Sequence, residues 1–201
     1  MARAVSESAP SAVVPEIRPI ASADWPAIVK LFGENGACGG CWCMSWRVPS
    51  HGKEWEAAKG EPNRRALCRL VKKGEAHAVL AFVEGGPVAW CSFGPRESFP
   101  RLMRSRALAR EYGPDTWSVV CFFIPPRWRR RGIGTALLRT ATERAFELGA
   151  REVEGFPAVP WDPKVAVPGA FAWTGVPRLF EACGYHRLKR KGRAIYVSSR
   201  E

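Results

Sequence analysis

The sequence predicts an α+β fold built around one strand–helix–strand crossover. Residues 117–124 (WSVVCFFI) are apolar throughout, which is typical of a strand buried on both faces. Residues 132–148 then follow an amphipathic helical period, and residues 151–156 have the composition of a second strand. Such a crossover joins parallel strands, whereas β-rich pairs on either side of it resemble antiparallel hairpins. The sheet is therefore expected to be mixed.

The beginning of the chain is predicted to be a loose tail followed by a strand and a helix. Residues 1–15 are rich in Ala, Ser, Pro and Val but contain no continuous apolar stretch, so we interpret them as a flexible tail and not as a signal peptide. Residues 16–20 are extended in character. Ser22 has the character of a helix N-cap, and Gly33 ends that helix. We expect residues 16–201 to form one domain, because a chain of this length supports a single core.

The middle of the chain alternates between helix and hairpin signals. Residues 54–73 follow a helical pattern that Pro62 interrupts. Two β-rich runs, residues 76–84 and 87–93, flank a Gly-Gly pair and predict a hairpin. Residues 94–116 form a long basic connection with a short helix, and a connection of that length in a compact domain is usually functional.

The last part of the chain is predicted to contain a loop, a short helix and a closing hairpin. Residues 157–176 are rich in Pro, Gly and Trp, which indicates a loop. Residues 177–182 begin with a proline, which a first helical turn tolerates. Residues 185–190 and 194–198 flank Lys191-Gly192 and predict the final pair of strands.

The composition limits the class of protein and of partner. Hydrophobic residues make up 46% of the chain, yet no apolar run reaches the roughly 18 residues that a membrane span needs. The net charge of +12 favours a polyanionic partner, either nucleic acid or a phosphate-rich coenzyme. Because the number of cysteines is odd, seven, and no secretory signal precedes them, we expect reduced thiols in a cytoplasmic protein.

The loop between the buried strand and the long helix has the features of a phosphate site. Gly132 and Gly134 open the helix, so backbone N–H groups and the positive end of the helix dipole face a ligand there. The preceding arginines add positive charge. The pattern is Arg-x-x-Gly-x-Gly, which lacks the Lys-Ser/Thr of a P-loop and differs from Gly-x-Gly-x-x-Gly.

Two stretches resemble the GNAT superfamily of acetyl-CoA-dependent N-acetyltransferases. FFIPPRWRRRGIGTALL is similar to the family's coenzyme-binding segment, and PRLFEACGYHRL is similar to its later helix that ends in a Gly-aromatic pair. The resemblance spans about residues 76–197. It implies an α/β/α layered GNAT fold, with a mixed twisted sheet of about six to seven strands, a central βαβ unit and flanking helices. The segment ACGGCWCMSWRVP and the later WTG and LFE stretches resemble a bacterial subgroup, which brings no acceptor with it.

The resemblance also implies where acetyl-CoA, the co-substrate, is bound. The pantetheine arm would pair with the end of the central strand where residues 151–156 splay away from it, and a strand N–H would polarise the thioester carbonyl. The pyrophosphate would lie on the loop and the start of the helix. The expected coenzyme-binding residues are Phe122, Phe123, Ile124, Arg129, Arg130, Arg131, Gly132, Ile133, Gly134 and Thr135.

In this family a primary amine attacks the thioester directly, so a base is needed to neutralise the amine. Glu154, on the strand beside the expected cleft, is the first candidate and Glu97 is the second, although a salt-bridged or exposed carboxylate explains either residue equally well. Many family members carry a tyrosine four residues before the Gly of the Gly-aromatic pair, but Phe180 stands there in this chain. A tyrosine general acid is therefore not expected at that position.

The segment ACGGCWCMSWRVP admits two interpretations. Cys38, Cys41 and Cys43 could bind zinc, with His51, Cys68 or His77 as a fourth ligand, but the chain has no second Cys-x-x-Cys pair. We therefore favour packing or acceptor-pocket lining and expect no metal. Five tryptophans are expected either around the acceptor, where they would suit an apolar or cationic amine, or in the core. They are Trp42, Trp46, Trp90, Trp161 and Trp173.

Three functions remain open from the sequence. The favoured one is acetyl transfer from acetyl-CoA to a primary amine of a small molecule or protein. The second is a GNAT-fold protein that binds the coenzyme without catalysis, which Phe180 motivates. The third, a basic nucleic-acid-binding module, is not favoured, because no helix-turn-helix, zinc-finger or RRM pattern is present. No membrane partner is expected, and homodimerisation stays open.

Overall fold

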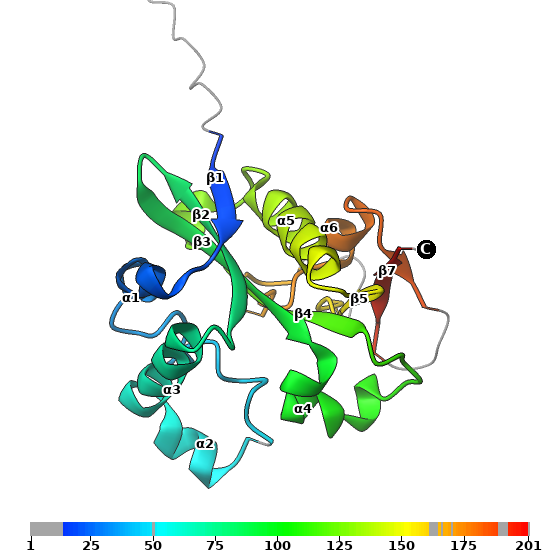
Figure 1. Ribbon diagram of the computed structural model, residues 1–201, viewed down its shortest axis with the longest axis horizontal. Helices are drawn as coiled ribbons and strands as arrows, with labels where there is room; N and C mark the ends of the chain where they lie inside the picture. Colours follow the sequence, from blue (N-terminus) through cyan, green and yellow to red (C-terminus); the bar gives the residue numbers. More distant parts are fainter. Residues whose placement is uncertain are drawn as a thin grey trace, which may run out of the picture.

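A seven-stranded mixed sheet forms the middle layer of the protein (Figure 1). The computed structural model describes residues 14–49, 51–160, 165, 167–169, 171–188 and 193–200. The strand order is β1-β2-β3-β4-β5-β7-β6, in which only the β4–β5 pair is parallel. The strands are β1 (Glu16–Pro19), β2 (His77–Val83), β3 (Gly86–Pro95), β4 (Thr116–Phe123), β5 (Glu152–Gly155), β6 (His186–Arg187) and β7 (Tyr196–Ser199).

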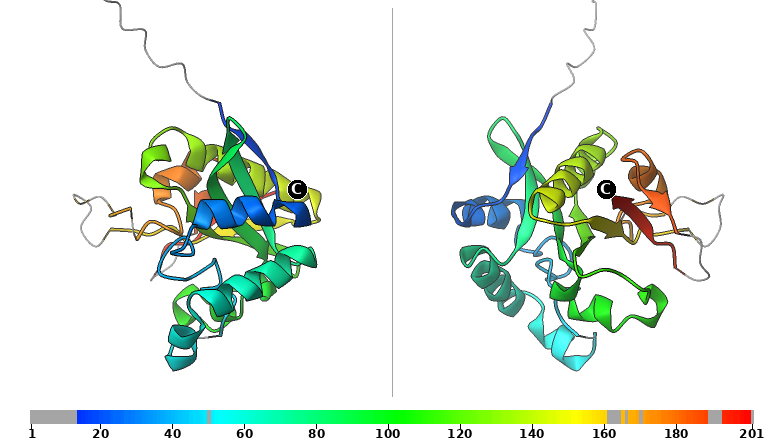
Figure 2. Two further views of the ribbon diagram at one scale, coloured as in Figure 1. Left: turned by 90° about the vertical axis from the view of Figure 1, so that its left-hand side faces the viewer. Right: turned by 45° about the vertical axis from the view of Figure 1, so that its right-hand side comes forward.

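Helices cover both faces of the sheet (Figure 2). The α-helices are α1 (Trp25–Phe32), α2 (Lys53–Ala58), α3 (Glu61–Lys72), α4 (Pro100–Met103), α5 (Ile133–Glu147) and α6 (Pro177–Glu181). Short 3-10 turns are η1 (Ser22–Asp24), η2 (Arg96–Ser98), η3 (Arg106–Leu108) and η4 (Pro126–Trp128). The predicted α/β/α layering is therefore confirmed, and so is the predicted crossover, in which α5 joins the parallel strands β4 and β5.

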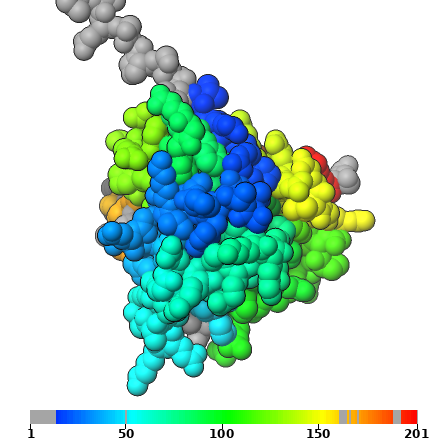
Figure 3. Space-filling model, turned by 60° about the vertical axis from the view of Figure 1, so that its left-hand side comes forward, coloured from blue at the N-terminus to red at the C-terminus, as the bar shows by residue number. Residues whose placement is uncertain are grey.

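The alternation of side chains along β2 explains why the sheet needs a helix layer on each side. Val79 and Ala81 pack with the buried face of α5, whereas Ala78, Leu80 and Phe82 pack with α1 and α3. In the space-filling view, α1 and α3 lie side by side over their face of the sheet (Figure 3). An apolar core on each face holds the sheet between the helix layers, and a third apolar cluster around Trp46, Phe99 and Phe156 adds to them.

The helical pattern of residues 54–73 forms two helices. The break lies at Lys59 and Gly60, before the expected interruption at Pro62. Gly60 has a φ of +81°, a left-handed conformation that favours glycine, and Pro62 lies in the first turn of α3, where a missing N–H costs nothing. The proline thus begins a helix instead of interrupting one.

Strand β4 has two different halves. Its first half, Thr116 to Val119, pairs with β5. A bulge then shifts the register against β3 between Ser92 and Phe93, and the β5 strand ends at Gly155. Beyond Val119, the edge of β4 that faces β5 is no longer covered by that strand. The predicted splaying of the two parallel strands is therefore present.

Of the predicted tail, residues 1–13 lie outside the described residues. Among the residues that the structure describes, no helix combines the length and the apolarity needed to cross a membrane.

Candidate coenzyme and acceptor site

Beyond Val119, the backbone groups of β4 and of Ile124 on the side of β5 have partners outside that strand. The Val120 carbonyl accepts a hydrogen bond from the indole N–H of Trp46 at 2.9 Å. The Phe122 N–H donates to the carbonyl of Trp173 at 2.7 Å, and the Ile124 carbonyl accepts from Arg129 Nε at 2.7 Å. Side chains and a loop therefore satisfy the groups that a neighbouring strand would otherwise bind.

The loop that follows β4 leads into an uncapped helix. Gly132 is the N-cap of α5 in the left-handed conformation, with a φ of +75°, and it makes no side-chain cap. The first intrahelical bond runs from the Ala136 N–H to the Gly132 carbonyl, so the N–H groups before Ala136 have no partner within the helix. No acidic residue lies in the first turn. This geometry suits a phosphate group.

The arginines of the loop have different surroundings. Arg129 folds back towards β4 and lines the cavity described below, whereas Arg130 is exposed with a φ of +58°. Arg131 lies over the Trp128 ring at 5.3 Å. Within the described residues, the buried indole N–H of Trp128 has no hydrogen-bond partner. A loop with an unpaired buried donor and two outward cations is suited to an anionic ligand.

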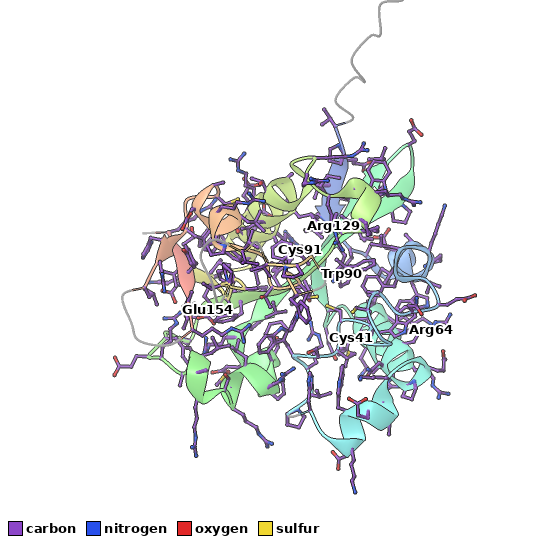
Figure 4. All side chains as sticks on the ribbon, turned by 180° about the vertical axis from the view of Figure 1, so that it is seen from behind. Cys41, Arg64, Trp90, Cys91, Arg129 and Glu154 are labelled. Atoms are coloured by element: carbon purple, nitrogen blue, oxygen red, sulfur yellow. The ribbon has the colours of Figure 1, made fainter. Side chains whose placement is uncertain are left out.

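A cavity of about 560 Å³ opens beside the end of β4. Its walls join the expected coenzyme strand to the segment that carries the cysteines and tryptophans. Figure 4 shows Arg129, Trp90 and Cys41, which all line it, near the middle of the molecule, with Glu154 set apart from them. Its lining residues include Cys41, Cys43, Ser45, Trp90, Cys121 and Trp173. The wall is predominantly apolar and aromatic.

An unusual backbone turn forms one side of the cavity. Trp42 and Cys43 both have positive φ, +45° and +55°, which is uncommon for residues with a Cβ. The Trp42 ring lies so close to Gly36 that a Cβ on that glycine would come within 2.3 Å of the indole nitrogen. Packing of Trp42 against Trp25 and Phe32 also holds this turn in place.

The thiols that face the cavity have very different acidities. The pKa of Cys43 is lowered to about 7, first by the hydrogen bond from the Cys121 thiol and then by the Trp90 N–H, the Arg47 charge and the Ser92 hydroxyl, against the effect of burial. The same contact raises the pKa of Cys121. Burial raises the pKa of Cys41 to about 11. Of these three thiols, Cys43 is thus the one that ionises near neutral pH.

A histidine lies just behind the cavity wall. Ser45 lines the cavity, and its hydroxyl lies 3.1 Å from His51 Nε2. Arg101 hydrogen-bonds both this hydroxyl, at 3.0 Å, and the same ring nitrogen. Burial and the Arg101 charge lower the pKa of His51. Because Arg101 already donates to Nε2, this histidine is a poor proton acceptor.

Glu154, the first candidate base, lies outside the cavity lining. Its side chain is fully buried and forms ion pairs with Arg96 and with Arg110, the latter at 2.8 Å. The Ser118 hydroxyl donates to the same carboxylate at 2.6 Å. Arg110 also pairs with Glu152. These contacts match the alternative that the sequence left open, a salt-bridged carboxylate.

The remaining candidate acid and base residues are also away from the cavity lining. Glu97 is exposed in η2. Phe180 is fully buried, and a Cβ on Gly155 would come within 2.0 Å of its ring. Tyr185 bonds Thr142 at 2.6 Å, and Tyr196 donates to Glu181 at 2.7 Å. Phe180 thus packs in the core and offers no hydroxyl to the cavity.

The cysteines and tryptophans divide between the cavity and the core. Among the described residues, no group of three or more His, Cys, Asp or Glu side chains could hold a metal ion. Of the five tryptophans, Trp90 and Trp173 line the cavity, Trp42 and Trp46 are buried, and Trp161 lies outside the described residues. Sequence reasoning missed Cys121 and Trp55, which also line the cavity, because neither belongs to a motif.

Several solved acetyltransferases share this fold. PaiA N-acetyltransferase from Thermoplasma acidophilum, in complex with coenzyme A, is 12% identical, with coverage of 93% of this chain and 99% of that chain and a TM-score of 0.52. Phosphinothricin acetyltransferase from Sinorhizobium meliloti, in complex with acetyl-CoA, is 17% identical, with coverage of 92% and 88% and a TM-score of 0.53. Ribosomal-protein-alanine N-acetyltransferase from Brucella melitensis is 15% identical, with coverage of 92% and 99% and a TM-score of 0.53.

The sequence itself gives the family. No curated protein sequence matches this chain. Residues 43–160, however, match the acetyltransferase (GNAT) family, and this range contains the turn at Cys43, the splayed strand β4 and the glycine loop that begins α5. With the layered fold and the cavity beside β4, this match establishes that the chain belongs to the GNAT acetyltransferase family.

Proposed function

We propose that this protein is an N-acetyltransferase that transfers the acetyl group of acetyl-CoA to a primary amine of a small molecule or protein by direct attack. One observation carries the proposal: an uncapped helix N-terminus with a glycine loop lies next to a splayed strand edge that opens into a cavity. Together these features offer an anion site, a backbone edge and a space for the reaction in one place.

The coenzyme would be held mainly by backbone groups. N–H groups from Gly132 to Thr135 would bind the pyrophosphate, and the outward-facing Arg130 and Arg131 would add positive charge. The edge from Phe122 to Ile124 would pair with the pantetheine arm. The remaining expected contacts, Phe123, Arg129, Ile133 and Gly134, belong to the same strand end, loop and first helical turn.

The Phe122 N–H is our candidate donor to the thioester carbonyl. It now donates to the Trp173 carbonyl at 2.7 Å, so a carbonyl oxygen already occupies the position where a thioester oxygen would accept the bond. The Trp173 carbonyl would have to leave before the thioester oxygen takes its place, after which the N–H, fixed by the strand, is already oriented towards the charge that develops on that oxygen. The apolar and aromatic walls favour an acceptor whose amine is attached to an apolar group.

The structure describes all seven cysteines as free thiols, in keeping with the reducing cytoplasm that we propose as the location. Nucleic acid is not proposed as a partner, because binding of the coenzyme phosphates already accounts for the positive charge of the loop before α5. A coenzyme-binding protein without catalysis is the second candidate, because Phe180 is buried and carries no hydroxyl.

Calorimetry with acetyl-CoA tests the proposal. We expect binding at sub-millimolar coenzyme and its loss in Gly132→Glu, because that carboxylate would lie where the phosphates bind. Arg129→Ala should weaken binding by about 10-fold or less, since one screened charge near a phosphate contributes about 1 kcal/mol. Arg65→Ala removes an exposed charge on α3 and serves as the control.

Coenzyme release in the presence of a panel of primary amines, followed by chromatography, separates the two candidates. Turnover of any amine supports the acetyltransferase, whereas binding without turnover supports the second candidate. No binding by the wild-type protein would refute both.

A further inference from the structure

We propose that Cys43 carries the proton of the reaction: its thiolate accepts a proton from the amine, and the resulting thiol returns it to the departing coenzyme sulfur. The inference rests on the proposed function, because it assigns a residue to that same reaction. The three positions considered from the sequence, Glu154, Glu97 and Phe180, do not line the cavity, so none of them is placed for this role.

Hydrogen-bond donors surround the Cys43 sulfur on the sheet side. The indole N–H of Trp90 donates to Sγ at 3.3 Å. Ser92 and Cys121 are direct cross-strand partners on β3 and β4, and both side chains act on the Cys43 thiol to lower its pKa. Donors of this kind stabilise a thiolate more than a thiol. The sheet therefore presents Cys43 to the cavity with its negative charge already stabilised.

Charge acts on the sulfur in the same direction. The guanidinium of Arg47 attracts the Cys43 thiolate, and Glu75 is the other negative group that acts on this arginine. Arg47 lies over the Phe99 ring at 4.9 Å. On the opposite face of the sheet, the buried thiol of Cys91 has a strongly raised pKa, so it adds no competing charge at neutral pH.

The backbone holds Cys43 in this position against its local preference. Trp42 and Cys43 adopt positive φ, and the turn is closed by bonds from the Trp42 N–H to the Gly36 carbonyl and from the Met44 N–H to the Cys41 carbonyl. Strained conformations persist where surrounding structure enforces them, and they concentrate at functional sites. Here the strained turn carries Cys43, a residue of the wall that also includes the end of β4.

No other described group on the cavity wall is as well suited to the role. The described lining contains no carboxylate, histidine, lysine or tyrosine. The pKa values of Cys41 and Cys121 are raised, and the guanidinium of Arg129 offers only hydrogen-bond donors. Cys38 is exposed, and His51 lies behind Ser45 with its ring nitrogen bound to Arg101.

Two protons leave the ammonium nitrogen during the reaction, one to Cys43 and one to solvent. The Cys43 thiolate takes one proton from the ammonium group, which frees the nitrogen lone pair to form the C–N bond. The thioester C–S bond breaks, and its electron pair stays on the coenzyme sulfur. The second nitrogen proton passes to solvent as the amide forms. The Cys43 thiol then protonates the coenzyme thiolate, a favourable transfer because an ordinary thiolate is the stronger base.

The test compares variants of the full chain with acetyl-CoA and the most active amine of the panel. Cys43→Ala and Cys43→Ser should each lower kcat by about 100-fold or more, which is the usual contribution of a proton-transfer group, and change the acetyl-CoA Kd by about twofold at most. Cys43→Ser keeps the size of the side chain and guards against misfolding of the alanine variant. Cys68→Ser, on α3 away from the cavity, is the thiol control and should behave as wild type.

The pH profile gives a readout that a purely structural role would not move. In the wild type, kcat/KM should rise with pH as the Cys43 thiol ionises. Trp90→Phe removes the N–H donor but keeps an aromatic ring, so the pKa of Cys43 should rise and the rising limb should move to higher pH.

The results for the Cys43 variants and for the wild type distinguish a failure of this inference from a failure of the proposed function. Wild-type turnover by Cys43→Ser, with an unchanged pH profile, would overturn the role of Cys43 and leave the acetyltransferase standing. An acetyl group found by mass spectrometry on Cys43 after incubation with acetyl-CoA alone would also overturn it, because the residue would then be a nucleophile. Failure of the wild type to bind acetyl-CoA, or to acetylate any amine, overturns both.

Discussion

The two halves of β4 satisfy the backbone hydrogen-bonding groups of the edge that faces β5 in different ways. From Thr116 to Val119 the strand has a neighbour on each side, and the carboxylate of Glu154 is enclosed there by two guanidinium groups and a hydroxyl. From Val120 to Phe123 it keeps only β3, and its other edge meets the Trp46 indole, the Trp173 carbonyl and a cavity.

The difference between the two halves separates a region stabilised by buried ion pairs from a region that borders a cavity. In the closed half, the buried charges neutralise one another, so they rigidify the strand pair and are poorly placed to exchange protons with a substrate. In the open half, the titratable groups are thiols beside a space of about 560 Å³. Substitutions in the closed half should therefore cost more stability than substitutions in the open half.

The closed half should be the more sensitive to loss of one charge. Glu154→Ala leaves Arg96 and Arg110 without their shared carboxylate, and removing one partner of a buried ion pair typically costs about 3–5 kcal/mol. Urea denaturation monitored by circular dichroism measures the free energy of unfolding. Glu54→Ala, an exposed carboxylate on α2, is the control and should change it by about 0.5 kcal/mol or less. Unchanged stability with abolished turnover would instead make Glu154 the base.

Removing the Trp46 N–H, which takes the place of a strand partner in the open half, should cost less stability. Trp46→Phe deletes the N–H that satisfies the buried Val120 carbonyl, and an unsatisfied buried acceptor costs about 1–3 kcal/mol. The same denaturation experiment measures this loss. Trp117→Phe, in the closed half, is the control. It replaces a buried tryptophan by the same smaller ring, but no hydrogen bond of the Trp117 indole N–H is seen in the described structure. An equal loss in both variants would mean that ring packing, and not the hydrogen bond, accounts for the effect.

Thiol reactivity should distinguish the cavity thiols without any change in stability. Alkylation requires the thiolate, whose fraction grows as pH rises through the pKa of the thiol. Modification of Cys43 by iodoacetamide should therefore increase most steeply near pH 7, whereas Cys41, with a pKa of about 11, should stay almost unmodified there. Peptide mass spectrometry after brief labelling follows each residue. Faster modification of Cys41 than of Cys43 at pH 7 would contradict the order of acidities.

Local patterns in the sequence were sufficient to predict most of the elements. The apolar run 117–124, the amphipathic period that follows it and the Gly-Gly hairpin each depend on residues close together in the chain, and all three are confirmed. The loop before α5 was predictable for the same reason, since the glycines and the arginines occur within one short segment. Its role in coenzyme binding stays a prediction.

The surroundings of single side chains could not be predicted in this way. Glu154 and Arg96 are 58 residues apart, and Cys43 and Trp90 are 47 apart, so only the assembled sheet brings them together. The positive φ of Trp42 and Cys43 has no local signal, because neither is a glycine. The surroundings of Cys43 therefore could not be predicted from the cysteine segment alone.

The two outermost strands have a consequence for self-association. Strand β1 has four residues, two of them charged, and ends in Pro19, which has no N–H to offer to a neighbour. Strand β6 has two residues, His186 and Arg187, both exposed. Within the part of the chain that the structure describes, neither border of the sheet presents a long row of free backbone groups, which disfavours growth of the sheet by addition of another chain. The apolar surface of the cavity thus lies in a sheet whose described edge strands are short and polar.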